Sequence, residues 1–218
     1  MADLEPPAPT GAYELPMFPL EHPVVPGQVI PLMLFEPRYL ALADHLAEAD
    51  EPDFGVVGIE RGREVGGDDV RSDIGVVVRV LELGALPDGR RSLVAVGTRR
   101  IRVGGWLTDD PFPRAMVEDW PDDLIDGLPG AVDELTAAVE SLLELARQRQ
   151  PGLDLELPPN DPDHLDTTVW RLIAFAGLGP LDTADLLRAP DPVTRARAAA
   201  VLVDERRSLL DALGEDDL

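Results

Sequence analysis

Few residues in this chain have the type and spacing that acid–base or metal chemistry requires. The three histidines, His22, His45 and His164, lie far apart, and none belongs to an H-x-x-x-H or H-E-x-x-H pattern. The serines lie apart from the histidines, and the chain has neither a G-x-S-x-G elbow nor a G-x-G-x-x-G fingerprint. We therefore expect the histidines to be surface or packing residues. A hydrolase using His22 or His45 stays open as an alternative, which requires one of these imidazoles within hydrogen-bond reach of a carboxylate in a cleft.

Three pairs of adjacent aspartates have the chemistry to bind calcium or to serve acid catalysis. With 42 acidic residues in a chain of 218, such pairs arise by chance. All three fall in segments that we predict to be loops, so we expect solvated surface carboxylates. We predict no catalytic residue, no metal and no cofactor. The pairs are Asp68-Asp69, Asp109-Asp110 and Asp122-Asp123.

The charge balance is strongly acidic and excludes several classes of protein. The 19 basic residues are all arginines, and the formal net charge is −23. A phosphate-binding P-loop and a serine–lysine protease dyad both need a lysine, so this sequence contains neither. The negative field repels phosphate backbones and anionic membranes, so we expect no nucleic-acid and no membrane partner. For the one notable basic cluster, Arg99, Arg100 and Arg102, contact with RNA is one interpretation, and salt bridges to nearby acids are the interpretation that we favour.

Composition is that of a globular protein. Hydrophobic residues make up 44% of the chain, and no apolar run approaches the roughly 20 residues that a membrane helix needs. The first residues have neither the basic nor the apolar region of a signal peptide. Cysteine is absent, which excludes disulfides, thiolate metal sites and cysteine catalysis. We expect an acidic, cytoplasmic protein that is not an enzyme.

The elements that must position any site begin with a proline-rich apolar stretch over residues 15–39. Proline lacks an N–H and fixes φ, so no helix can pass through this stretch. We predict short extended pieces with prolines at strand ends or edges. Pro26-Gly27 predicts a turn, residues 29–35 a strand, and Pro37 the first turn of a helix over 36–49.

Further strands are predicted before residue 120 and only helices after it. A charged segment, residues 61–72, is expected to be an exposed loop. Alternating or β-branched segments predict strands over 54–59, 74–83, 93–96, 100–103 and 114–120, with a hairpin turn at 86–90. Apolar residues at helical spacing predict helices over 128–149, 165–176, 183–187 and 192–213.

The change of period predicts an α+β protein in two subdomains. The predicted parts are a disordered tail (1–12), a β-rich subdomain (13–120), a linker (121–130) and an α-helical bundle (131–218).

Several motifs in order make the chain resemble the amino-terminal domain of Lon protease, its substrate-recognition module. LPMFPL, PG and PLMLFEPRY match the opening of that family, and FEPRY at 35–39 is the most specific part. Val76 stands where the family often has threonine. The resemblance covers about residues 13–213 and implies a PUA-like β pseudo-barrel followed by a small helical bundle. Further matches lie at 54–57, 73–77, 87–90 and 97–103.

The resemblance implies a non-catalytic protein- or peptide-recognition module that stands alone, without ATPase or protease parts. The implied partners are unfolded or extended segments of client proteins. A separate protease or chaperone is a further implied partner, with the module as an adaptor or regulator of proteolysis. A small-molecule-binding module with a pocket between the two subdomains is an alternative.

Five residues are candidate peptide contacts. The aromatic ones would form an apolar patch if exposed, and would otherwise pack the end of the barrel. The charged ones are either part of a contact surface or, as we favour, local partners at the start of a helix with Tyr39 in the core. The candidates are Trp106, Phe112, Trp120, Glu36 and Arg38.

Overall fold

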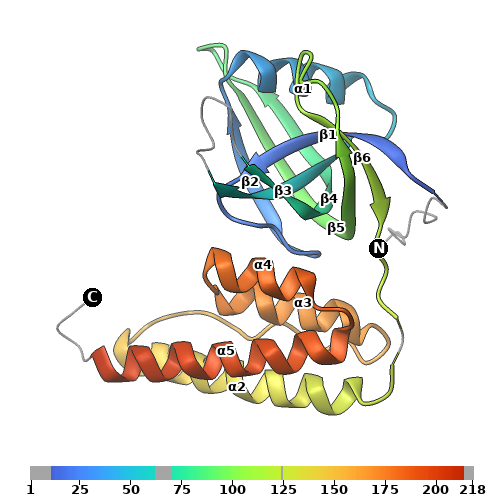
Figure 1. The fold of residues 1–218 in the computed structure, drawn as a ribbon. Helices are drawn as coiled ribbons and strands as arrows, with labels where there is room; N and C mark the ends of the chain where they lie inside the picture. The colour runs from blue at the N-terminus through green and yellow to red at the C-terminus, as the bar shows by residue number, and fades with distance from the viewer. Residues whose placement is uncertain (1–10, 62–69, 124, 214–218) are drawn as a thin grey trace. The chain divides into compact units, whose positions relative to one another are not determined.

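The computed structural model describes residues 11–61, 70–123 and 125–213. Residues 1–10 of the predicted tail and the Asp68-Asp69 pair lie outside these ranges. Within them, six strands and five helices form the α+β fold that the change of period predicts (Figure 1).

The strands and one helix occupy the first part of the chain, and four helices follow. The first set is β1 (Tyr13–Leu20), β2 (Val29–Leu34), α1 (Pro37–Glu48), β3 (Asp53–Arg61), β4 (Val70–Ala85), β5 (Arg91–Trp106) and β6 (Arg114–Asp119). The second set is α2 (Leu128–Arg149), α3 (Leu165–Ala176), α4 (Pro180–Arg188) and α5 (Pro192–Leu213).

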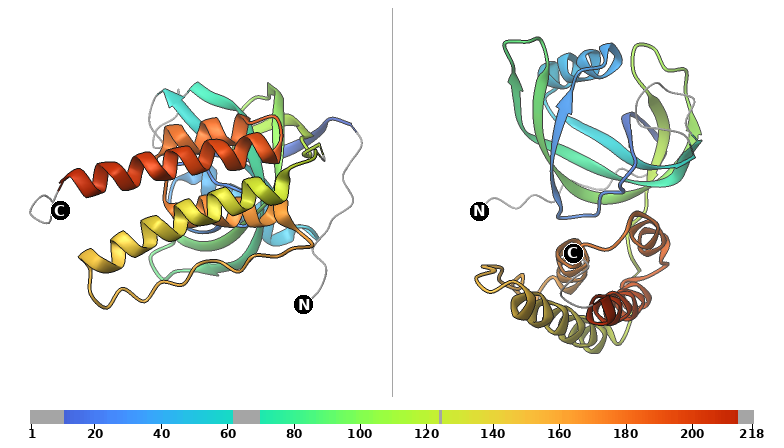
Figure 2. Two further views of the ribbon diagram at one scale, coloured as in Figure 1. Left: turned by 90° about the horizontal axis from the view of Figure 1, so that it is seen from below. Right: turned by 90° about the vertical axis from the view of Figure 1, so that its left-hand side faces the viewer.

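The sheet closes on itself because β5 is long enough to take three partners. Its first half pairs with β2, its second half pairs with β6, and β4 lies along its other edge. β4 pairs with β3, β3 with β1, and β1 with β6, so these four strands and β5 form a closed ring. β2 is a sixth strand that pairs with β5 outside the ring. The β1–β3 pair is parallel and the other pairs are antiparallel. Figure 2 shows the resulting curled sheet, which is the predicted β pseudo-barrel.

Inward-facing residues from five strands fill the barrel. Glycine is needed where β4 approaches β3: a Cβ on Gly75 would collide with the backbone carbonyl oxygen of Val56, so only glycine lets these two strands pack this closely. The clustered core residues are Leu15, Met17, Val57, Val77, Ile101, Ala115 and Val117. This packing fixes which face of each barrel strand points to solvent.

The predicted turns form where the sequence places them. Gly27 has φ of 79° and Gly89 has φ of 86°, the left-handed values that glycine adopts without strain. Pro37 lies in the first turn of α1, where its missing N–H costs no hydrogen bond.

Two predictions on the strands are wrong in extent. The separate strands at 93–96 and 100–103 are one strand, β5, because a bulge at Thr98 keeps the pairing with β4 continuous. The Thr98 hydroxyl donates to the carbonyl of Val77 at 2.9 Å, which holds the bulge. The predicted loop at 61–72 belongs at both ends to strands, since β3 extends to Arg61 and β4 begins at Val70.

A polar belt of five residues, one from each ring strand, ties the barrel together. The Tyr13 hydroxyl donates to Asp119 at 2.7 Å, and Arg99 donates to Asp119 at 2.9 Å and to the Tyr13 oxygen at 3.1 Å. Arg99 also lies 3.8 Å from Asp53, which accepts from Arg79 at 2.8 Å. Burial and the hydrogen bond to Asp119 raise the pKa of Tyr13 well above its ordinary value.

The chain divides into two compact units. One comprises Met1–Val24 and Val29–Pro121, and the other comprises Val25–Gln28 and Asp122–Leu218. The helix α2 already begins at Leu128, inside the segment predicted as a linker. None of the described helices has the length and apolarity that a membrane crossing requires.

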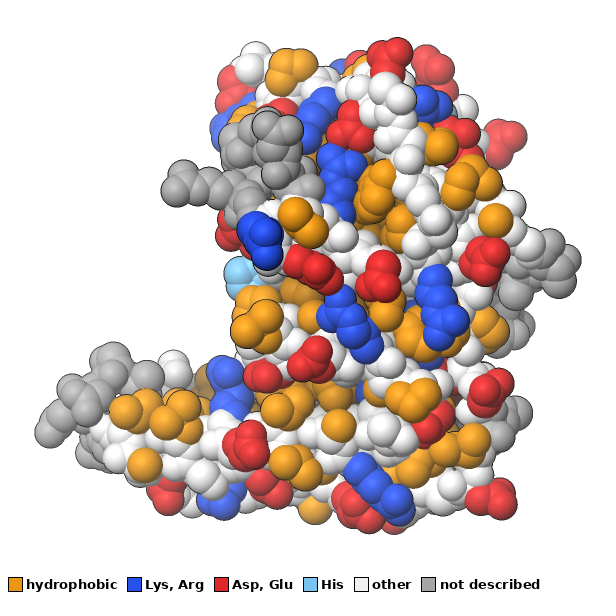
Figure 3. Space-filling view, viewed as in Figure 1, with side chains coloured by type: hydrophobic (Ala, Val, Ile, Leu, Met, Phe, Trp, Pro, Cys, Tyr) orange, Lys and Arg blue, Asp and Glu red, His pale blue; other side chains and the backbone are white. Residues whose placement is uncertain are grey.

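In the helical unit, α2 and α5 run side by side in the same direction (Figures 1 and 2). Ion pairs and hydrogen bonds follow this arrangement: Glu134 contacts Arg197 near the start of both helices, and Arg149 donates to the carbonyl of Asp211 near their ends. The outward face of α5 remains apolar in part (Figure 3). Its exposed apolar residues are Val201, Leu209 and Leu213.

Arg195 is fully buried at the centre of the helical unit. Its guanidinium donates two hydrogen bonds to Asp122, at 2.7 and 2.8 Å, and stacks on the Trp170 ring at 4.0 Å. It also donates to the carbonyl of Leu186 in α4 at 3.3 Å. The expectation of a solvated surface is therefore wrong for Asp122, because this carboxylate neutralises a buried arginine.

Candidate functional site

The histidines do not converge with acids in a cleft. His22 and His45 are exposed, and the His45 ring lies 5.3 Å from the ring of Phe112. His164 caps α3, where its Nδ1 lies 3.3 Å from an Asp161 oxygen. Across residues 11–61, 70–123 and 125–213, no three potential metal ligands gather. These positions give the hydrolase alternative no support.

One aspartate of the second pair, Asp109, is held by an arginine whose side chain is mostly buried. Asp109 accepts two hydrogen bonds from Arg71, at 2.7 and 3.2 Å. The same guanidinium lies over the Trp106 ring, 4.4 Å from its centroid. Trp106 is therefore half-buried beneath a charged group and does not present an open apolar face.

The other predicted aromatic contacts are also packed. The Trp120 ring lies between the guanidinium groups of Arg100 and Arg102, at 4.1 and 3.9 Å. Phe112 is buried. Arg99 pairs with Asp119, so each arginine of the basic cluster contacts an acid or an aromatic ring. A role for the three aromatic residues in peptide contact stays a prediction.

Glu36 and Arg38 pair with each other at the entrance to α1. Nε of Arg38 donates to a Glu36 carboxylate oxygen at 3.2 Å, and the guanidinium lies over the Tyr39 ring at 4.5 Å. Tyr39 itself is buried. This geometry matches the local interpretation, and contact with a peptide stays a prediction for this pair too.

β2 carries an exposed apolar row that the sequence pattern alone does not distinguish from a buried strand. Val29, Met33 and the following Phe35 expose 56%, 45% and 54% of their surface, and Pro31 between them is exposed. The alternate residues Ile30 and Leu34 are buried. We call Val29, Pro31, Met33 and Phe35 the β2 strip.

The strip lies on a strand whose second edge has no partner in the described part of the chain. There β2 stands at the end of the strand order and pairs with β5 alone. Proline occurs in sheets where its missing N–H faces away from the neighbouring strand. In a strand, every second residue directs its backbone N–H and C=O groups to the same edge. We therefore infer that the backbone groups of Val29, Pro31 and Met33 point to the free edge.

The neighbouring strand widens this apolar surface. Val29 lies opposite Val96, and Pro31 lies opposite Val94. Directly opposed residues lie on the same face of a sheet, and both β5 valines are half-buried. An extended segment added beside β2 would therefore meet apolar side chains and unpaired backbone groups together.

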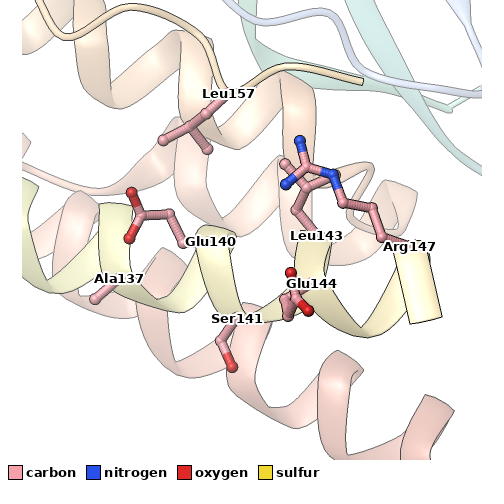
Figure 4. Close-up of a pocket in the computed structure, with 7 residues that line it drawn as sticks. All are labelled: Ala137, Glu140, Ser141, Leu143, Glu144, Arg147 and Leu157. Carbon is pink, nitrogen blue, oxygen red and sulfur yellow. The ribbon is translucent and has the colours of Figure 1, made fainter. Parts of the chain in front are cut away.

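A separate surface depression lies on α2 and the segment after it (Figure 4). Glu140, Ser141 and Glu144 line it beside Arg147, whose guanidinium donates to the carbonyl of Leu155 at 2.7 Å. It is open and acidic and lacks the enclosed apolar wall typical of small-molecule sites.

A family model for the ATP-dependent protease La (LON) substrate-binding domain matches residues 14–205. The Lon protease of Cytophaga hutchinsonii is 25% identical over 202 residues, which cover 90% of this chain and 25% of that protein. Lon protease 2 of Sorangium cellulosum is 28% identical over 219 residues, which cover 94% of this chain and 26% of that protein. The chain thus spans about a quarter of the length of these relatives.

Solved structures agree with the family model. The Lon N-terminal domain protein from Xanthomonas campestris has a TM-score of 0.57 and 28% identity, over 84% of this chain and 94% of that chain. The N-terminal domain of the Mycobacterium avium complex Lon protease has a TM-score of 0.62 and 20% identity, over 88% and 99%. Since the family model matches most of the residues and these structures share the fold, the chain belongs to the Lon substrate-binding domain family.

Proposed function

We propose that this domain binds extended apolar segments of other proteins along the β2 strip. The observation that carries the proposal is that an exposed apolar row and an unpaired strand edge coincide on β2, within the described residues. Membership of a substrate-binding family supports a protein segment as the ligand.

The physical basis is addition of a strand to the sheet. Backbone hydrogen bonds to the free edge would supply affinity for any extended chain. Every second side chain of the bound segment would lie beside the β2 strip on the same face of the sheet, so apolar residues at alternate positions would be preferred. Folded proteins hide such segments in their cores, so unfolded clients are the partners that fit.

In this proposal the domain binds and releases its client without catalysing a reaction. The bound segment then passes to a separate protease or chaperone, for which this domain is an adaptor or regulator. The support is family membership, since the relatives that share this domain are themselves called Lon proteases.

A matched pair of valine variants tests the strip by titration calorimetry. The probe is a short synthetic peptide of alternating leucine and serine with a lysine at each end. Val29→Ser removes apolar surface from the strip and weakens binding about tenfold, since burial of a valine contributes about 1.5–3 kcal/mol. Val70→Ser is the control, because Val70 is 49% exposed on β4, away from the strip. Equal losses in both variants, or no binding by the unaltered protein, would contradict the proposal.

A further inference from the structure

The β2 strip contains the most exposed methionine of the described residues. Met33 is 45% exposed, whereas Met17 is 0% exposed in the barrel core and Met116 is half-buried on β6. The whole chain has no cysteine, so no thiol competes for an oxidant. Oxidation of sulfur in proteins follows its exposure, which directs an oxidant to Met33.

We propose that Met33 is an oxidation site and that its sulfoxide weakens client binding, an inference that rests on the proposed function. The co-reactant is a peroxide. A lone pair of the thioether sulfur attacks the hydrogen-bearing oxygen of the peroxide, and an S–O bond forms as the O–O bond breaks. The proton of the attacked oxygen passes to the departing oxygen, which leaves as water or an alcohol. The sulfur is oxidised, the peroxide is reduced, and methionine sulfoxide reductase reverses the change.

The position of Met33 explains why this change matters. The side chain lies between Pro31 and Phe35 in the strip, so the side chains of a segment paired with β2 pack beside it. The thioether is apolar and adaptable, whereas the sulfoxide oxygen is a hydrogen-bond acceptor that a docked apolar side chain cannot satisfy. We expect affinity for an extended peptide to fall about tenfold. The fold stays intact, because Met33 contributes little to the barrel core.

The first test measures where oxidation occurs and needs no client. The full chain is treated with a limiting amount of hydrogen peroxide, and peptides are mapped by mass spectrometry over time. Met33 gains one oxygen several times faster than Met17 and Met116. Equal rates at Met33 and Met116 would overturn the assignment of Met33 as the site.

The second test measures affinity for the leucine–serine peptide before and after peroxide. The affinity of the unaltered protein falls and is restored by methionine sulfoxide reductase. In Met33→Leu the ratio of the two affinities is one, whereas Met116→Leu responds as the unaltered protein does. Met33→Gln, which places a polar group in the strip, reproduces the weak binding without oxidant.

The two proposals fail differently. If the untreated protein does not bind the peptide, the proposed function is wrong, and the mapping experiment still decides whether Met33 is oxidised. If untreated protein binds and oxidation of Met33 leaves the affinity unchanged, the switch is overturned while the proposed function stands.

Discussion

Side chains of the same type have different roles in this protein, depending on whether they are buried or exposed. Ile30 and Leu34 enter the core while Val29 and Met33 on the same strand remain in solvent. Arg195 is buried against Asp122, whereas Arg197, two residues later in α5, makes an exposed pair with Glu134. The sequence shows adjacent acids at 122 and 123, and it does not show which of them faces a buried guanidinium.

Replacement of Arg195 by methionine is expected to lower the free energy of unfolding by about 3–5 kcal/mol. The reason is that the mostly buried Asp122 carboxylate loses the two hydrogen bonds that the Arg195 guanidinium donates, and the carbonyl of Leu186 loses a donor. Urea titration followed by circular dichroism of the helices measures the change. Arg197→Met is the control, with an expected loss of at most about 1 kcal/mol because its pair is exposed. Equal losses would show that burial of Arg195 contributes nothing.

Among the elements, the free edge of β2 determines what can pair with the sheet, and the polar belt contributes to the stability of the barrel. Much of this level could be predicted from the sequence: α2 and α3 have the bounds that their apolar spacing indicates, and Gly27 and Gly89 form the expected turns. The pairing partners of the strands could not be predicted. Alternation of apolar and polar residues shows that a strand has a buried and an exposed face, but it does not show which strand lies beside it. For that reason the sequence predicts a strand over the apolar row of β2 but does not show that the row is exposed.

The free edge of β2 carries one proline, which reduces its capacity to pair. Pro31→Val restores an N–H at the middle of that edge, and we expect two effects: a severalfold gain in peptide affinity and concentration-dependent self-association. Sedimentation velocity over a range of concentrations measures the second effect. Leu32→Val is the control, because both leucine and valine have a backbone N–H and the substitution adds no donor to the free edge. An unchanged sedimentation coefficient in Pro31→Val would mean that the edge is not open to another strand.

The polar belt makes barrel stability sensitive to alkaline pH. The raised pKa of Tyr13 means that the folded protein keeps the phenol proton after the unfolded chain has lost it. The stabilisation is complete below the unfolded pKa of about 10 and is lost as pH rises above it, at up to about 1.4 kcal/mol per pH unit. Thermal unfolding between pH 8 and 11 should show the unaltered protein approaching Tyr13→Phe in stability. A constant difference between the two would contradict the role given to Tyr13.

At the scale of the whole molecule, the net charge of −23 acts on every partner that approaches. Many described arginines are already paired with acids, including Arg79, Arg91 and Arg114. The field that remains attracts cationic segments and repels anionic ones. This property could be predicted from composition alone, whereas the location of the strip required the fold.

Association rates should depend on the charge of the client. The leucine–serine peptide with terminal lysines is expected to associate at least about tenfold faster than the same peptide with terminal glutamates at low salt. At about 1 M salt, where the Debye length is about 3 Å, the difference should nearly vanish. Stopped-flow fluorescence measures both rates. A preference for the glutamate peptide would mean that local positive charge outweighs the overall field.

The central claim is that a client segment pairs with the free edge of β2. Hydrogen exchange of single backbone amides, read by NMR with and without saturating peptide, tests it without any substitution. We expect slower exchange of the Val29 and Met33 amides when peptide is bound, while the amides of Ile30 and Leu34 stay as protected as before. Protection that appears on α2 around Glu140 and Glu144, or on the outward face of α5, with β2 unchanged, would contradict it.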